Sequence, residues 1–381
     1  MTRDLGFGPP VYGFGAGIFF LGYLLFEIPG ARLVERRSSR IALGVMLIAW
    51  GAAAALMGTV RGVKEFYAYR VLLGVAEAGF FPGIVIYLSR WFPNADRARA
   101  IGALAVGLPA ANLVGAPVSS WLLTQNWWNI PGWRWLFIVE GLPSVIAGII
   151  TVMHLADRPR DAKWLSDEEK DWLERILATE QEERREPRRK STTGNFNFEL
   201  VLLALIWFFD NMGVYGFNLW LPMIIRKLSS YSPASVVAIA ATPFVGALIS
   251  AACVSISSDR SGERLWHTGL PMMTFGFGLA LSVFFGEHLG FAIGALSLAA
   301  LGLTSGTPGF WALATASPGA SGSTRVAFIT SAGALGGFCG PYLMGFLRET
   351  TNGFEAGMAT LAISAFGAGV LAVIGFRRAA R

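Results

Sequence analysis

Long apolar runs separated by short polar segments dominate the chain from end to end. A helix needs about 20 mostly apolar residues to cross a bilayer core, and eleven of these runs are long enough. Their many small residues allow helices to pack closely in lipid. The pattern predicts an all-α membrane protein with about eleven transmembrane helices. The predicted spans lie near residues 11–31, 41–60, 66–89, 98–124, 133–153, 199–225, 235–258, 266–286, 289–314, 324–347 and 354–376.

The third span carries two charged residues near its middle, Arg70 and Glu77. Ionisable groups inside a membrane usually face a bundle interior or a wet cavity, and they are functional candidates by default. Seven residues make two helical turns, roughly 10 Å of rise, so both side chains leave the same face of the helix. The alternative interpretation is a buried ion pair that only fixes helix packing.

Composition supports this class and narrows the functions. The chain is 54% hydrophobic and 15% charged, whereas soluble domains are roughly 25% charged. Its two cysteines, Cys253 and Cys339, lie in apolar runs and indicate neither a disulfide framework nor a metal site. An enzyme would need clustered His, Asp or Glu residues or a soluble catalytic domain. We therefore predict that the protein is not an enzyme and uses no cofactor or metal.

Basic residues indicate the orientation in the membrane. One set of alternate loops, together with the C-terminus, holds 23 of the 31 Lys and Arg residues. Cytoplasmic loops of membrane proteins carry such an excess. We therefore expect a multi-pass protein of the cell (inner) membrane with a cytoplasmic C-terminus. We interpret the net charge of +6 as this topology signal and not as a sign of nucleic-acid binding.

Short features recur along the chain at a constant offset of 224 residues. Pro9 matches Pro233, and Pro117 matches Pro341. Glu35-Arg36-x-x-x-Arg40 matches Asp259-Arg260-x-x-x-Arg264 in the same way. Parallel repeats of this kind, in two halves of six helices, are typical of a major class of secondary transporters.

The offset also predicts that the first half lacks one helix. Residue 225 pairs with residue 1, so the span at 199–225 has no partner within the sequence. We expect two helical bundles of five and six helices: 1–153 and 199–381. Residues 154–198 form a cytoplasmic linker with a capping box at Ser166 and Glu169 and a charged helix after it. The alternative is a natural eleven-helix protein.

Several other polar or aromatic residues within the spans are candidates to line a substrate site. A packing role is the alternative for each. They are Tyr23, Asn112, Asn211, Tyr215 and Trp311. The two matching loops, with Glu35, Arg36, Arg40, Asp259, Arg260 and Arg264, can clamp neighbouring helix ends. We expect those loops to act as gates between the inward-open and outward-open states.

With these residues in view, the sequence resembles the major facilitator superfamily, and within it the anion:cation symporter family near the tartrate, phthalate and hydroxyphenylacetate permeases. The resemblance runs from about Asp4 to the C-terminus. Its motifs include Tyr23-x-x-Phe26-Glu27-Ile28-Pro29, Arg70-x-x-Leu73-Gly74-x-x-Glu77-Ala78, Arg90-Trp91-Phe92-Pro93, Trp133-Arg134-Trp135-Leu136-Phe137, Glu140-Gly141-Leu142-Pro143 and Asp157-Arg158-Pro159. They are specific for the family and uninformative about the substrate.

The resemblance implies a proton-driven importer of a small organic acid, with the superfamily's usual monomeric form. It implies that Arg70 binds the substrate carboxylate, that Glu77 takes part in proton coupling, and that Tyr23, Asn112 and Trp311 line the site. It also implies an Asp-Arg pair in a first helix, for which this sequence has no counterpart. The residues fit: Arg suits bidentate carboxylate contact, and an anion at Arg70 would favour protonation of Glu77.

Two other kinds of function are alternatives to uptake. A non-transporting sensor, or an inactive copy of a transporter without its first helix, would show the same spans. Drug efflux would use the same fold with fewer fixed charges for anions, and it ranks below uptake. The acid itself stays open, because a tartrate-like, a sugar-acid-like and an aromatic-acid-like anion would each satisfy one Arg.

Overall fold

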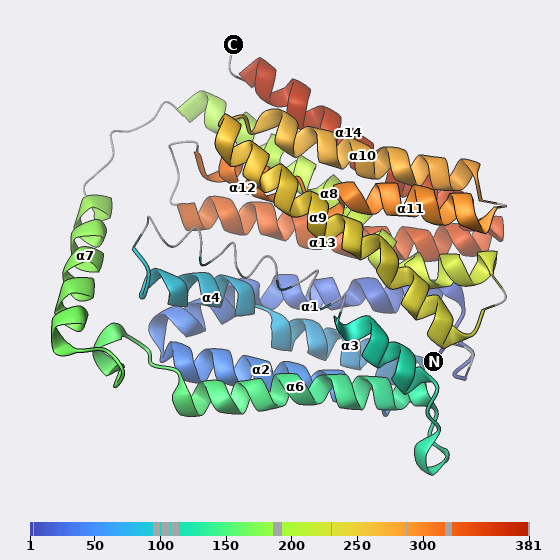
Figure 1. Cartoon of the computed structure of the whole chain (residues 1–381), viewed down its shortest axis with the longest axis horizontal. Helices are drawn as coiled ribbons and strands as arrows, with labels where there is room; N and C mark the ends of the chain where they lie inside the picture. The colour runs from blue at the N-terminus through green and yellow to red at the C-terminus, as the bar shows by residue number, and fades with distance from the viewer. Residues whose placement is uncertain are drawn as a thin grey trace. The chain divides into compact units, whose positions relative to one another are not determined.

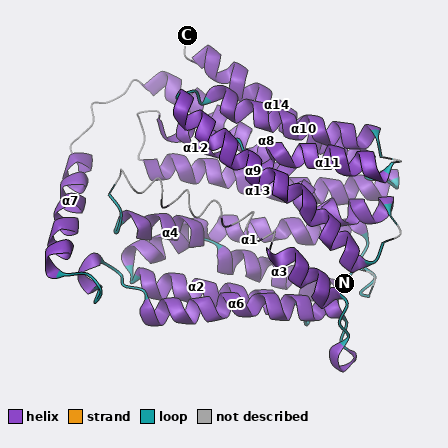
Figure 2. Ribbon diagram, viewed as in Figure 1, coloured by secondary structure: helices purple, strands orange, loops and turns teal. Residues whose placement is uncertain are grey.

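A computed structural model describes residues 1–2, 4–93, 100, 107, 111, 114–185, 193–229, 231–286, 288–316 and 322–379. Within these ranges the regular structure is helical (Figures 1 and 2). The helices are α1 (Pro9–Arg36), α2 (Ser39–Met57), α3 (Val63–Glu77), α4 (Phe80–Ser89), α6 (Gly132–His154), α7 (Asp167–Arg185), α8 (Thr193–Leu228), α9 (Pro233–Ser261), α10 (Leu265–Phe284), α11 (Leu289–Leu303), α12 (Thr307–Ala316), α13 (Gly322–Thr351) and α14 (Glu355–Ala379). Two short 3₁₀ helices, η1 (Trp127–Asn129) and η2 (Pro159–Asp161), lie in loops.

The described helices match the spans that hydropathy predicted. Eight of them, counting α3 with α4 and α11 with α12 as single spans, are long and apolar enough to cross a membrane. The spans predicted at 266–286 and 324–347 are also helices, α10 and α13. Much of the span at 98–124 lies outside the described residues, and its last part is the apolar helix Val114–Leu123.

Helix bounds repeat at the offset found in the sequence. α1 begins at Pro9 and α9 begins at Pro233, 224 residues later. α6 (Gly132–His154) corresponds in the same way, within a residue or two, to α14 (Glu355–Ala379). The span that holds Arg70 and the span that corresponds to it 224 residues later are each broken into two helices, α3 and α4 in the first half and α11 and α12 in the second. The internal repeat is therefore visible in secondary structure as well as in sequence.

Cα packing divides the described chain into two compact units. The first contains Met1–Leu21, Pro109–Gly132 and Ser191–Arg381, and the second contains Gly22–Leu108 and Trp133–Lys190. The start of α1 therefore packs with the C-terminal helices. The predicted boundaries at 153 and 199 stay a prediction.

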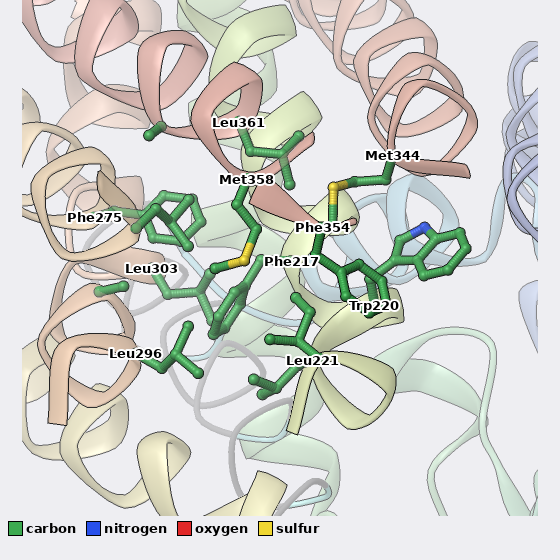
Figure 3. Packing of buried hydrophobic residues seen from close by; sticks show 14 of the residues in the cluster. Phe217, Trp220, Leu221, Phe275, Leu296, Leu303, Met344, Phe354, Met358 and Leu361 are labelled. Carbon is green, nitrogen blue, oxygen red and sulfur yellow. The ribbon is translucent and has the colours of Figure 1, made fainter. Parts of the chain in front are cut away.

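The first unit has an extensive apolar core in which α8 packs on α13 and α14, and α10 packs on α11 and α14. Figure 3 shows this core around Phe217, Trp220 and Phe275, which are fully buried. The indole N–H of Trp220 donates to the Pro341 carbonyl at 3.1 Å, so the largest buried ring also satisfies its polar atom.

Glycines bring helices together in both units. A Cβ on Gly51 of α2 would lie 2.5 Å from the Gly141 carbonyl oxygen of α6. A Cβ on Gly369 of α14 would lie 2.5 Å from the Gly269 carbonyl oxygen of α10. These two helix pairs correspond in the repeat. Backbone-to-backbone packing of this kind is typical of helices in lipid.

The charged helix predicted after the capping box is present as α7. The Glu169 N–H donates to Ser166 Oγ at 3.2 Å, and the Ser166 N–H donates to Glu169 Oε2 at 2.9 Å. These reciprocal bonds make the capping box that the sequence predicted.

Candidate functional site

Arg70 and Glu77 lie on α3, both half-buried. They are two turns apart on a continuous stretch of helix, so they share a face as predicted, and their charges interact electrostatically. α3 ends at Glu77. Ala78 has an extended backbone, with φ −59° and ψ 134°, and Gly79 is left-handed with φ 79°. Glu77 is therefore the last residue of a helix that is broken inside its span.

The break has a local cause in the sequence. Pro82 has no backbone N–H, so the helical bond to the Ala78 carbonyl cannot form. Helix resumes at Phe80, and the Gly83 N–H donates to the Gly79 carbonyl at 2.8 Å. The corresponding span of the second half breaks between Leu303 and Thr307, directly before Pro308. The break after Glu77 was not predicted from the sequence.

α1 packs closely against this broken span. A Cβ on Gly22 would lie 2.7 Å from the Val71 carbonyl oxygen, and a Cβ on Gly30 would lie 2.6 Å from the Ala78 carbonyl oxygen. Tyr23, the residue after Gly22, is half-buried. Tyr23, Arg70 and Glu77 thus belong to the second unit, on two helices in backbone contact.

The α8 candidates belong to the first unit. Asn211 is 9% exposed and donates from Nδ2 to the Trp207 carbonyl at 2.8 Å, one turn back on its own helix. Tyr215 packs edge-on against Phe20, with ring centroids 4.5 Å apart. Asn218, on the same face, has a buried Oδ1 without a hydrogen-bond partner in the described part of the chain. Sequence analysis left Asn218 out of the site, although its spacing from Asn211 was visible.

Trp311 is part of an aromatic cluster in the first unit. Its ring lies 5.2 Å from that of Trp207 and 5.4 Å from that of Phe310, both at steep angles. Trp207 and Phe310 are stacked at 4.6 Å. Trp311 is half-buried, so part of its ring is exposed beside this cluster. Asn112 and the Asp259 side chain lie outside the described residues.

The first predicted gating loop is a tight turn between α1 and α2. Glu35 and Arg36 lie in the last turn of α1, and Ser38 is the N-cap of α2. Asp157 accepts from Ser38 Oγ at 2.6 Å and from the Arg40 N–H at 2.8 Å. Arg90 donates to the Glu35 carbonyl at 2.7 Å and to Ser39 Oγ at 2.7 Å.

Asp157 and Arg90 therefore hold this turn, through its backbone and its serines. Sequence analysis named neither as a gating residue. Both stand in the motifs Asp157-Arg158-Pro159 and Arg90-Trp91-Phe92-Pro93, which were the available signal.

The second gating loop is held by its own residues. α9 continues to Ser261, so Arg260 lies in its last turn, and Gly262 makes the turn with φ 68°. Arg264 donates to Ser258 Oγ at 2.8 Å.

Glu263, which was not a predicted site residue, organises the start of α10. It accepts from the N–H groups of Trp266 at 2.9 Å and His267 at 3.2 Å, and its Oε2 lies 2.9 Å from His267 Nδ1. Partial burial alone would raise the pKa of Glu263, but these hydrogen bonds outweigh it and hold the pKa below its usual value. His267 Nε2 lies 2.9 Å from Ser257 Oγ, which connects α10 back to α9.

No group of three or more His, Cys, Asp or Glu residues in the described ranges could hold a metal ion. The candidate residues are cations and polar groups on apolar helices, an arrangement suited to binding a ligand.

A comparison with protein-family profiles shows the family to which the chain belongs. The profile of the Major Facilitator Superfamily matches residues 1–341. The chain belongs to the major facilitator superfamily. Its members among solved structures have the same fold: the inward-open xylose transporter XylE from E. coli aligns with a TM-score of 0.74 at 16% identity, covering 96% of this chain and 85% of that one. The two-bundle major facilitator fold is thus confirmed.

Sequence relatives are transporters. A protein of Agrobacterium vitis named as a tartrate transporter is 37% identical over 94% of this chain and 83% of its own length. A quinolone resistance transporter of Acinetobacter baumannii is 34% identical over 95% of this chain and 84% of its own length. This protein is therefore a membrane transporter of small molecules and not an enzyme.

Proposed function

We propose that this transporter takes up a small organic anion together with a proton, by alternating access. The observation that carries the proposal is the placement of Arg70 and Glu77 on one face of α3, inside an apolar span. A cation and an acid inside a membrane span cost free energy, so such residues are usually functional. Arg70 would bind the substrate carboxylate, and Glu77 would carry the proton.

The break after Glu77 supports the same roles. Broken transmembrane helices form substrate sites in other transporter folds, where their exposed helix ends meet charged groups. The N-terminus of α4 begins three residues after Glu77 and carries partial positive charge. A fixed cation at Arg70 and a favourable helix end after Glu77 therefore lie along the same broken span.

Coupling follows from electrostatics. Before substrate binds, the charges of Arg70 and Glu77 interact electrostatically. A bound carboxylate would neutralise Arg70, which would favour protonation of Glu77, so anion and proton would bind together. Tyr23, Asn112, Asn211, Tyr215 and Trp311 are proposed to line the substrate site.

The tartrate-transporter relative favours a hydroxy-acid substrate, and a sugar acid or aromatic acid would also satisfy Arg70. We propose a monomer in the cell (inner) membrane, with the excess of basic loops and the C-terminus on the cytoplasmic side.

The direct test is uptake of labelled tartrate, a sugar acid and an aromatic acid into proteoliposomes, with and without an inward proton gradient. The proposal predicts gradient-dependent accumulation of at least one acid by the wild-type chain. Accumulation that ignores the gradient would overturn proton coupling. Absence of uptake across the panel would favour a non-transporting sensor or an inactive copy.

Efflux of aromatic drugs is the second candidate function, because one relative is a quinolone resistance transporter. The same vesicles distinguish the two. Quinolone extrusion driven by a proton gradient, without acid uptake, would favour efflux.

A further inference from the structure

Asp210 is an acidic residue deep in α8 that the proposed function does not use. It lies midway along α8, which runs from Thr193 to Leu228, and it is 4% exposed. In the sequence it is the one charged residue between Leu200 and Ile225. An ionised carboxylate in such a place is expensive unless a cation or several hydrogen bonds compensate it.

The surroundings of Asp210 are apolar. Ile206, one turn earlier, is fully buried in a cluster with Met272, Phe310 and Ala368. Gly213, one turn later, faces Phe275: a Cβ there would lie 3.0 Å from that ring. Asp210 therefore lies between two apolar clusters of the first unit.

No hydrogen bond or ion pair joins the Asp210 carboxyl to another described residue. α8 packs on α9, α11, α13 and α14, and Met272, Phe275 and Phe310 of α10 and α12 also lie beside it. These helices keep their charges near their ends, and the titratable group of α10 and α12 is His267, near the start of α10. Along α8 the nearest charges are Glu199 and Arg226, roughly 16 and 24 Å away at 1.5 Å per residue. The charged or titratable groups of α8, α9, α11, α13 and α14 and of their ends are Glu199, Arg226, Lys227, Asp259, Arg260, His288, Arg325, Cys339, Arg348, Glu349, Glu355, Arg377 and Arg378, with Tyr215 and Tyr342 as phenols.

We propose that Asp210 is a proton-binding residue of the C-terminal half and carries its proton at neutral pH. Protonation removes the charge that the apolar surroundings cannot compensate and leaves a neutral acid. The transporter then has an acidic group in each half, Glu77 on α3 and Asp210 on α8. The inference goes beyond the proposed function, because it assigns a second proton site that requires no substrate.

Infrared spectroscopy of the purified full-length chain tests this directly, because a protonated carboxyl has a C=O stretching band that an ionised carboxylate lacks. The wild-type spectrum at neutral pH should contain such a band and Asp210→Asn should lose it, a difference of one carboxylic acid per chain. Glu77→Gln is the matched control, and it should keep the Asp210 band. A carboxylate band for Asp210 at neutral pH would overturn the proposal.

A second measurement uses only the wild-type protein, so it does not require the Asp210→Asn variant to fold. Labelling the aspartate side-chain carboxyls of the wild-type protein with ¹³C should shift the C=O band of the protonated acid. Asp210 is the one aspartate that the sequence places in the middle of an apolar span, so a labelled protonated-acid band reports on it. No shift of any protonated-acid band on labelling would overturn the proposal. Both readouts are independent of transport, so failure of the proposed symport would leave them interpretable.

Discussion

Gly79 and Gly30 are in direct backbone contact, which holds the break after Glu77 against α1. A Cβ on Gly79 would lie 2.6 Å from the Gly30 Cα, and the φ of Gly79 is 79°. Only glycine meets both demands without strain. Gly79, two residues after the end of α3, is thus packed against a second glycine on another helix.

Gly79→Ala should destabilise the protein and impair transport. The left-handed conformation alone costs about 1–2 kcal/mol for a residue with a Cβ, and the clash with Gly30 adds to it. Thermal melting of the purified protein measures the loss. Gly115→Ala is the control, because a Cβ there would have no heavy atom of the described chain within 4 Å. Equal melting of Gly79→Ala and wild type would contradict the proposed contact.

Asp157 should matter more to the first gating loop than Glu35 does. Its two oxygens accept from Ser38 and from the Arg40 N–H, whereas Glu35 contributes its backbone carbonyl. Asp157→Ala should therefore speed proteolysis or hydrogen exchange of the turn between α1 and α2, and Glu35→Gln should not. Equal protection of the turn in both variants would show that Asp157 does not hold it.

The ion pair between Arg325 and Glu199 joins α13 to α8, with Nη2 and Oε1 2.7 Å apart and Arg325 4% exposed. Glu199→Gln removes a charged hydrogen bond to a buried guanidinium, and such bonds contribute about 1.5–3 kcal/mol. We expect a loss of this order for Glu199→Gln in a melting experiment. The exposed pair between Lys227 and Glu355 is the control. Glu355→Gln should cost about 0–1 kcal/mol. Similar losses in both variants would show that the buried pair stabilises the protein no more than the exposed pair does.

Acid should loosen the start of α10. Hydrogen bonds hold the pKa of Glu263 below its usual value in the folded protein. The stabilisation is therefore present above the unfolded pKa and is lost as pH falls through the lower, folded pKa. Wild type should melt above Glu263→Gln at neutral pH, and the gap should close in acid. A difference in melting temperature that widens in acid would contradict the lowered pKa of Glu263 in the folded protein.

Hydropathy could predict the spans, because a helix must be apolar over its whole length to cross a membrane. It could predict Arg70 and Glu77 as candidates for the same reason. The repeat offset matched Pro9 with Pro233, the residues at which α1 and α9 begin. These are properties of single segments or of the sequence compared with itself.

The remaining features depend on contacts between distant segments. The break at Ala78 was missed because its apolar run is continuous, although Pro82 was a signal. The roles of Asp157 and Arg90 could not be read locally, because their partners lie more than 50 residues away in the sequence. Asn211 donates to the Trp207 carbonyl of its own helix, a contact that the sequence alone does not reveal, and its place in the substrate site stays a prediction.

The measurement that tests the central claim most directly compares Glu77→Gln with wild type in two assays on the same proteoliposomes. One is substrate counterflow without a gradient, and the other is accumulation driven by an inward proton gradient. Glu168→Gln, on the exposed helix α7, controls for loss of an acid. We predict that Glu77→Gln keeps counterflow and loses accumulation, whereas Glu168→Gln keeps both. Normal gradient-driven accumulation by Glu77→Gln would contradict the assignment of Glu77 as the proton carrier.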